Sequence, residues 1–232
     1  MNVLIVVAHH DDLELGCGGT VAKLVERGDR VVSLVLTHSG YSDARGKEIR
    51  GPSIAGVEAE EASRKLGYTL VTRGEDTFDV PLSDANVRSI LLTLEEYNID
   101  TVFTHWHGDT HPAHQRINAM VMHASRRIPR LFGFSVNWYI GAQVFAPQLF
   151  VAISETQWRR KIEALRCYES EISRTAGSWI DYLERQSLNL GLQMGVERAE
   201  AFVVYKHLWQ MDEPGLMSGD ARALSGDAAG AS

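Results

Sequence analysis

The sequence predicts an α/β fold, a single Rossmann-like domain whose mostly parallel sheet carries helices on both faces. Short apolar runs rich in β-branched residues alternate with segments of helical periodicity, and this alternation requires crossover helices between parallel strands. The 232 residues are enough for one domain and too few for a second enzyme domain. With 44% hydrophobic and 23% charged residues the chain has ordinary globular composition, so we expect a buried core.

The first βαβ unit opens the chain. Residues 3–8 form a short apolar run that is typical of a central parallel strand. The helix after it has Thr20 as its expected N-cap and ends before Gly28, which stands where a C′ glycine belongs. Residues 30–36 form the second strand. The unit therefore closes after a single helical crossover.

The same alternation continues to the end of the domain. Further strands are expected at residues 68–71, 101–104, 131–136, 149–153 and 201–205. Further helices are expected near residues 58–66, 87–94, 114–124, 158–165 and 179–183. The glycine-rich segment 37–56 predicts a long loop. Residues 212–232 are poor in apolar side chains, which predicts a flexible tail after a domain of residues 1–211.

Charge and cysteine content narrow the class of partner and the compartment. The formal net charge is -7, from 23 basic and 30 acidic residues, and no basic run occurs, so nucleic acid and anionic membranes are not the expected partners. A small-molecule substrate is expected, and a homo-oligomer is compatible with the sequence. Two cysteines make no disulfide framework, and neither a leader nor a membrane-spanning stretch is evident. These features predict a cytoplasmic protein.

Two polar clusters directly follow predicted strands. Residues 9–12 read His-His-Asp-Asp, and residues 105–114 hold four histidines and one aspartate, so the two clusters together contain six of the nine histidines. In an open α/β sheet, ligands bind outside the carboxyl ends of the strands, where both clusters lie. The sequence therefore predicts that the two clusters contribute to one site.

Histidine and aspartate without a cysteine pair match the ligands of a borderline metal such as zinc. His9 and Asp12 are three residues apart and can hold one ion from a tight turn. A third ligand from the second cluster would leave a position open for water, which is the arrangement of a catalytic site. Asp11 points differently from Asp12, so it can face that water as a general base.

The glycines at residues 16–19 also invite a dinucleotide-binding interpretation. Their spacing differs from Gly-x-Gly-x-x-Gly, and no acidic residue ends the second strand. We expect these glycines to provide backbone clearance at the turn into the helix, with Cys17 as a small packed thiol.

Residues 9–20 closely resemble the opening motif His-Pro-Asp-Asp-x-x-x-Gly-x-Gly-Gly-Thr of the LmbE/PIG-L-like metal-dependent deacetylases. Residues 111–114 resemble the family's His-x-x-His element, and residues 164–170 and 198–202 resemble its later blocks. The resemblance implies functions for five residues: metal ligands His9, Asp12 and His114, general base Asp11, and His111 as a cationic group that stabilises the oxyanion.

Three departures from the family pattern affect the expected substrate contacts. The usual proline is His10, and the usual aspartate between the paired histidines is Ala113, for which Asp109 is the candidate replacement. We assign His10 and Asp109 as candidate substrate-binding residues. The arginine expected just before the second helix falls on Ala55, and Arg50 is its candidate replacement.

The resemblance implies an N-deacetylase that depends on zinc or another divalent transition metal. It would hydrolyse the acetamide of an N-acetylglucosamine-type amino sugar or its conjugate, giving acetate and a free amine. Two alternatives stay open. One is a Rossmann-like nucleotide- or sugar-binding module without catalysis, which the missing carboxylate at Ala113 keeps in consideration. The other is an amidase that acts on a non-sugar acylated metabolite with the same residues.

Overall fold

The fold is built on one large twisted sheet. A computed structural model describes residues 1–136, 139 and 141–208. Within these residues, seven strands form the main sheet in the order β5-β2-β1-β6-β7-β9-β8. Their bounds are β1 (Asn2–Val7), β2 (Arg30–Thr37), β5 (Thr69–Glu75), β6 (Thr101–His105), β7 (Arg130–Phe134), β8 (Leu149–Ile153) and β9 (Arg198–His207). A hairpin of β3 (Tyr41–Ser42) and β4 (Glu48–Arg50) stands apart from it.

Most of the sheet is parallel, which confirms the predicted fold class. β1 pairs in parallel with both β2 and β6, and β5 and β7 extend the parallel part on either side. Only β9 and β8 join antiparallel, at the β7 edge. The chain reverses its direction of travel across the sheet between β1 and β6, and ligands of open α/β sheets bind at such a switch point.

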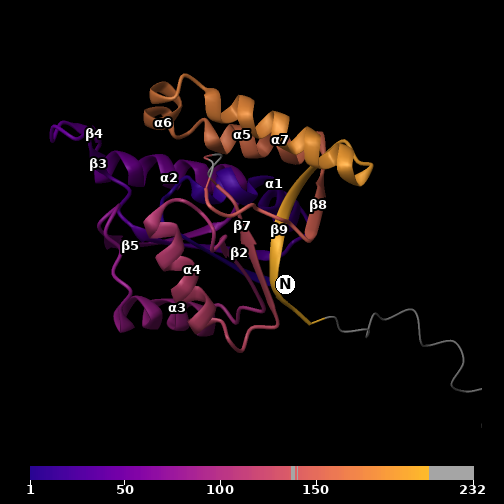
Figure 1. Cartoon of the computed structure of the whole chain (residues 1–232), viewed down its shortest axis with the longest axis horizontal. Coiled ribbons are helices and arrows are strands. Elements are labelled where there is room, and N and C mark those ends of the chain that lie inside the picture. The colour runs from indigo at the N-terminus through magenta and orange to yellow at the C-terminus, as the bar shows by residue number, and fades with distance from the viewer. Residues whose placement is uncertain (137–138, 140, 209–232) are drawn as a thin grey trace, which may run out of the picture.

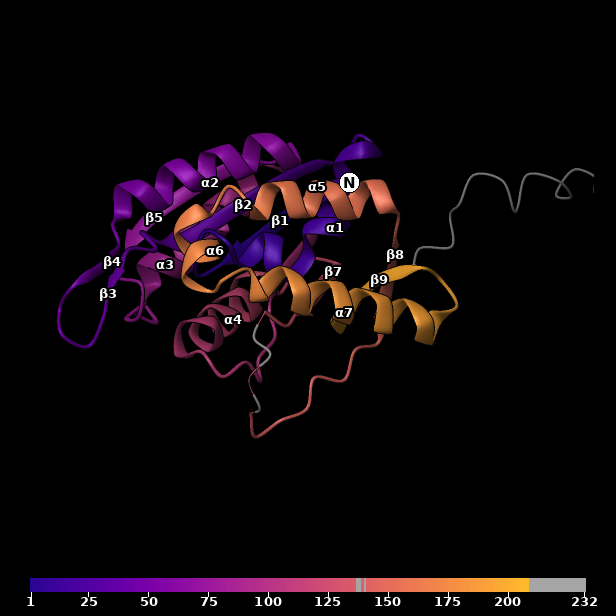
Figure 2. The ribbon, with the colours of Figure 1, turned by 90° about the horizontal axis from the view of Figure 1, so that it is seen from above.

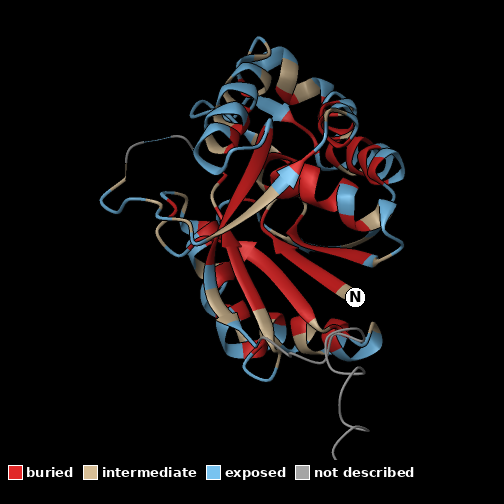
Figure 3. Ribbon diagram, turned by 90° about the vertical axis from the view of Figure 1, so that its right-hand side faces the viewer, coloured by how far each residue is buried: buried red, intermediate tan, exposed pale blue. Residues whose placement is uncertain are grey.

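Helices cover both faces of the sheet (Figures 1 and 2). One hydrophobic core joins the sheet to α1, α2, α5 and α7, and a second joins its other face to α3 and α4. The inner strands are buried along most of their length, whereas the edge strands β5 and β8 are largely exposed or half-buried (Figure 3). The helix bounds are α1 (Asp12–Glu26), α2 (Pro52–Leu66), α3 (Asp84–Glu96), α4 (Pro112–Ala124), α5 (Glu155–Leu165), α6 (Glu169–Arg174) and α7 (Ser178–Met194).

Helix α1 begins earlier than the sequence pattern predicts. Gly28 lies just past its end with a φ of +85°, as a C′ glycine should. The predicted N-cap at Thr20 is wrong, because α1 starts at Asp12 and continues through the glycine-rich segment with a kink at Cys17. Side chains from other elements hydrogen-bond to the backbone around that kink, so the helix tolerates the break.

The segment 37–56 is more ordered than a long loop. It contains the β3–β4 hairpin and the first residues of α2, which starts at Pro52 instead of near Glu58. Proline is favoured in the first turn of a helix because its missing amide would have no partner there. The short helix α6 was not predicted, and the predicted tail at residues 212–232 lies outside the described residues. Among the described residues, no helix is both long and apolar enough to cross a membrane.

Candidate active site

The first polar cluster forms the turn between β1 and α1. The backbone amide of His9 donates to Asp12 Oδ2 at 2.7 Å, which closes the turn. The Nε2 atom of His9 lies 3.0 Å from the backbone carbonyl oxygen of Thr77. A carbonyl can only accept, so Nε2 carries the proton of a neutral His9 ring and Nδ1 keeps its lone pair.

The second polar cluster leads from β6 into α4. His111 is the N-cap of α4, and its Nδ1 accepts the backbone amide of Ala113 at 3.2 Å. Asp109 Oδ1 accepts the backbone amide of His111 at 2.8 Å, which fixes the loop ahead of the helix. His114 then lies in the first turn of α4. The cap thus decides which way the histidines of this cluster face.

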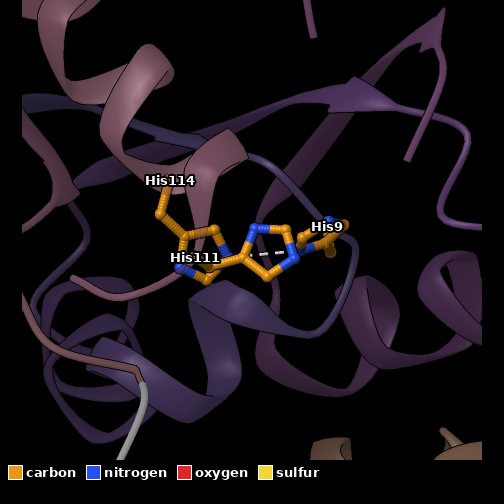
Figure 4. Close-up of side chains that lie close together, drawn as sticks. All are labelled: His9, His111 and His114. Atoms are coloured by element: carbon orange, nitrogen blue, oxygen red, sulfur yellow. Dashed lines mark hydrogen bonds between the residues drawn. The ribbon is translucent and has the colours of Figure 1, made fainter. Parts of the chain in front are cut away.

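Three side chains from the two clusters meet at one point. His114 Nε2 lies 3.2 Å from His9 Nδ1 and 3.4 Å from Asp12 Oδ2. The third separation, from His9 Nδ1 to Asp12 Oδ2, is 3.3 Å. Figure 4 shows the rings of His9 and His114 meeting beside that of His111. The predicted convergence of the two clusters is therefore present in the structure.

The chemistry of this triangle fits a divalent cation. Zinc with nitrogen and oxygen ligands at about 2.0–2.2 Å in tetrahedral geometry separates neighbouring ligand atoms by about 3.3–3.6 Å. The three separations here, 3.2, 3.3 and 3.4 Å, match one face of such a tetrahedron. Two ring lone pairs and a carboxylate oxygen at these distances repel one another unless a positive charge lies among them.

Two further histidines lie close to the triangle, and one nitrogen of each ring accepts a backbone amide. His105 stacks on His114 with ring centroids 3.8 Å apart, and its Nε2 accepts the backbone amide of Ala8 at 3.0 Å. His111 uses Nδ1 to accept the Ala113 amide, so a neutral His111 ring has its proton on Nε2. Neither ring offers a free lone pair to an ion beside His114.

Asp109 supports His114 from behind. Its Oδ2 lies 3.1 Å from His114 Nδ1, an arrangement that fixes the tautomer of a metal-binding histidine. Burial alone would lower the pKa of His114, but the Asp12 and Asp109 carboxylates raise it to about 10. A proton therefore provides the positive charge in the metal-free chain, and a metal ion would have to replace it.

Asp11 lies next to a buried arginine. Arg50 Nη1 donates to Asp11 Oδ2 at 3.1 Å. The same guanidinium lies near two more carboxylates, with Nη2 3.3 Å from Glu58 Oε2 and Nη1 3.8 Å from Glu171 Oε1. Burial raises the pKa of the Asp11 carboxyl above its usual value, although the Arg50 guanidinium opposes the shift. A carboxylate with a raised pKa is better matched to accepting a proton near neutral pH.

These groups open into one cavity of about 590 Å³. The predicted residues His9, Asp11, Asp12, His111 and His114 line it. Its other walls include Tyr41, Arg50, Phe78, Glu171, Arg174 and Trp179. The cavity thus places the three converging side chains, the Asp11 carboxylate and His111 around a common space that a small molecule can enter.

Two predicted substrate contacts lie elsewhere. Asp109 is 3% exposed and lies behind His114. His10 is also 3% exposed and lines a separate cavity with His38 and Arg73. Neither side chain is among those that line the cavity that contains Asp11, so a direct contact of His10 or Asp109 with a substrate there stays a prediction.

The hydrogen bonding of His111 favours a neutral ring over the expected cation. Its Nδ1 accepts a backbone amide, which leaves a single ring proton on Nε2. Burial, together with the neighbouring His114 and His9, lowers the pKa of His111 to about 4. A ring with its single proton on Nε2 can act as a neutral hydrogen-bond donor.

Arg50 is the main residue that sequence reasoning undervalued. It ends β4 immediately before Gly51 and Pro52, and it is 3% exposed. The proline at position 52 was the available signal, because it marks the true start of α2 and makes Arg50 the arginine that precedes this helix. Glu171 and Arg174 carried no comparable signal.

Known proteins resemble this chain over most of its length. Residues 4–125, more than half of the chain, match the family described as PIG-L: GlcNAc-PI de-N-acetylase. The uncharacterized deacetylase YaiS of Escherichia coli (strain K12) is 28% identical over 181 residues, which cover 72% of this chain and 90% of that protein. The diacetylchitobiose deacetylase of Thermococcus kodakarensis is 28% identical over 217 residues, which cover 85% of this chain and 80% of that protein.

Solved structures give the same result for the fold. The crystal structure of the conserved protein TT1542 from Thermus thermophilus has a TM-score of 0.75 and 26% sequence identity. The match covers 90% of this chain and 97% of that chain. The similarity in fold therefore covers more of the chain than residues 4–125.

Proposed function

The chain belongs to the PIG-L family of GlcNAc-PI de-N-acetylases, and we propose that it is a metal-dependent N-deacetylase of an N-acetylglucosamine-type amino sugar or its conjugate. The observation that carries this proposal is the triangle of His9, Asp12 and His114 beside the Asp11 carboxylate in one cavity. A diacetylchitobiose deacetylase among its relatives supports an N-acetylated sugar as substrate.

We assign the divalent cation to His9 Nδ1, Asp12 Oδ2 and His114 Nε2. Their nitrogen and oxygen donors favour zinc, and another divalent transition metal fits the same set. When bound, such an ion polarises the acetyl carbonyl and lowers the pKa of water. The hydrogen bonds that occupy His105 and His111 support this choice of ligands over the other nearby histidines.

Asp11 is the general base in this proposal. As water attacks the acetyl carbon and the new carbon–oxygen bond forms, the carboxylate of Asp11 accepts the proton that water loses. Arg50 holds this carboxylate through its 3.1 Å hydrogen bond, and its positive charge opposes the rise in the pKa of Asp11 that burial causes. Asp11 thus activates the water inside the cavity that would hold the acetamide group of the substrate.

His111 stabilises the charge that develops on the acetyl oxygen. Its Nε2–H can donate a hydrogen bond to that oxygen, and loss of one such donor typically lowers the rate about 100- to 1,000-fold. The proton held by Asp11 then passes to the amine nitrogen as the carbon–nitrogen bond breaks. The products are acetate and the free amine.

Acetate release tests this proposal. Wild type and Asp11→Asn, each loaded with zinc, are compared on a panel of N-acetylhexosamine compounds. We expect about one ion per chain in both proteins and acetate release lowered about 100- to 10,000-fold in the variant. If the variant is as active as wild type, the assigned base is wrong. A wild-type protein that holds the metal but deacetylates only non-sugar amides would favour the amidase alternative.

A further inference from the structure

A buried ion pair lies directly behind the metal-binding turn. Lys161 on α5 and Glu200 on β9 are 2% and 5% exposed, and Lys161 Nζ lies 2.7 Å from Glu200 Oε1. Neither residue lines the cavity that contains Asp11. A buried ion pair is weak evidence for stability, because desolvation of the two charges offsets most of their attraction. The position of this pair therefore calls for another explanation.

The pair contacts α1 where that helix is kinked. Cys17 has a φ of −149° and a ψ of 21°, which departs from helical geometry and divides α1 into two parts. In a regular helix the Gly19 amide would bond to the Leu15 carbonyl. Here the Gly19 amide donates to Glu200 Oε1 at 2.9 Å, and the Leu15 carbonyl accepts from Lys161 Nζ at 3.0 Å.

Glu200 also caps the second part of α1. Its Oε2 accepts both the backbone amide and the hydroxyl of Thr20, each at 2.7 Å. A carboxylate at the start of a helical segment satisfies free amides and complements the helix dipole. Lys161 and Glu200 therefore bind opposite sides of the kink and are bonded to each other across it.

The glycines of the motif make this approach possible. A Cβ on Gly18 would lie 2.9 Å from Lys161 Cγ. A Cβ on Gly19 would lie 2.5 Å from Ile153 Cδ1 and 3.2 Å from Glu200 Oε1. A Cβ on Gly16 would collide with the ring of Phe134. The glycines provide backbone clearance inside α1, not at the turn into the helix as expected, and the groups that need the space include the two members of the ion pair.

The first part of α1 carries the functional side chains. Asp12 begins it, Leu15 lines the cavity, and His9 is tied to Asp12 through the 2.7 Å bond that closes the turn. We propose that Lys161 and Glu200 are positioning residues, which act through the kink to hold this turn at the distance from His114 that chelation requires. This inference rests on the proposed function for its metal.

Cobalt binding is the first test. The affinity of Lys161→Met for Co²⁺ is measured by competition with a chelator, at a temperature where the variant is folded. We expect it to fall about 10- to 100-fold, as for other residues that support metal ligands. Arg198→Met is the matched control, because Arg198 is also buried, lies on β9 and pairs with Glu155 and Glu184 away from α1. It should change the affinity less than about threefold.

The double variant Lys161→Met/Glu200→Gln separates positioning from stability. It removes the uncompensated carboxylate that the single variant leaves buried, so its unfolding temperature should return toward that of wild type. Its cobalt affinity should stay low, because the lysine bond to Leu15 is still missing. Recovery of affinity together with stability would show a purely structural pair and overturn the inference, as would wild-type affinity in Lys161→Met.

Hydrogen exchange on the metal-free protein tests the inference independently of any metal. Peptides that cover residues 12–20 should exchange faster in Lys161→Met than in wild type, and Arg198→Met should leave them unchanged. Equal exchange in Lys161→Met and wild type would contradict the inference. If wild type takes up no cobalt, the proposed metal site fails, and this exchange measurement still decides whether the ion pair holds the turn.

Discussion

His114 Nε2 lies 3.2 Å from His9 Nδ1, although 105 positions separate the two residues along the chain. The sheet explains this proximity, because β1 and β6 are adjacent parallel strands whose carboxyl ends meet at one edge. His9 follows β1, and His114 lies in the helix that follows β6. The sheet topology thus brings together two histidines that are far apart in the sequence.

Asp109→Asn should weaken metal binding, although Asp109 is not one of the proposed ligands and acts only through His114. The two carboxylate oxygens of Asp109 face the backbone amide of His111 and His114 Nδ1, one each. The asparagine side chain has a single oxygen, so it can place an acceptor at only one of these two positions. The affinity for zinc should fall about 10- to 100-fold, measured by chelator competition. His114→Ala, which removes a ligand, should weaken binding more. If Asp109→Asn binds zinc as wild type does, Asp109 does not support His114.

His111→Ala should retain metal and lose rate. We expect kcat to fall about 100- to 1,000-fold, because the donor to the acetyl oxygen is missing. The change also removes the N-cap of α4, which is worth about 0.5–2 kcal/mol.

His111→Asn is the control for that lost cap. Asparagine is a good N-cap residue, so this variant should regain the lost stability and still lack the activity. Activity that returns with stability would mean that His111 serves only the helix.

The pH dependence of the free energy of unfolding of the metal-free protein should reflect the protonation of Glu14. Tyr68 donates to Glu14 at 2.8 Å, whereas Tyr168 donates its one hydroxyl proton to the His10 carbonyl at 2.6 Å and also lies 3.3 Å from Glu14. A protonated Glu14 satisfies that last contact by donating to the Tyr168 oxygen. Burial raises the pKa of Glu14 to about 8.

The sign of the pH effect follows from this raised pKa. The stabilising contribution of neutral Glu14 is complete below the usual pKa of 4.5 and is lost as the pH rises through about 8. Between these values wild type should lose about 1.4 kcal/mol per pH unit relative to Glu14→Gln, measured by urea unfolding. Parallel pH profiles for the two proteins would contradict a neutral Glu14.

Much of the fold was predictable because buried parallel strands have short apolar runs in the sequence. The run at residues 101–104 corresponds to β6 at Thr101–His105, and the others lie within a few residues of their strands. The start of α1 was not predictable in this way. Its kink is stabilised by Lys161 and Glu200, more than 140 residues later in the chain, and local propensity contains no such information.

The part of the site that was predictable consists of residues that follow the carboxyl ends of β1 and β6. His9, Asp12 and His114 follow adjacent strands, so the sequence places them near one another. The orientation of Asp109 was not accessible, because the choice between His111 and His114 depends on how the loop before α4 turns. Arg50 reaches Asp11 only after the β3–β4 hairpin folds.

The location of a bound zinc ion tests the central claim most directly. Crystals of the zinc-loaded protein, measured on either side of the zinc absorption edge, give the position of the ion from its anomalous signal. We predict one peak at about 2.0–2.2 Å from His9 Nδ1, Asp12 Oδ2 and His114 Nε2. A peak bound elsewhere, or bonded to His111 or His105 in place of one of these three atoms, would contradict the assignment.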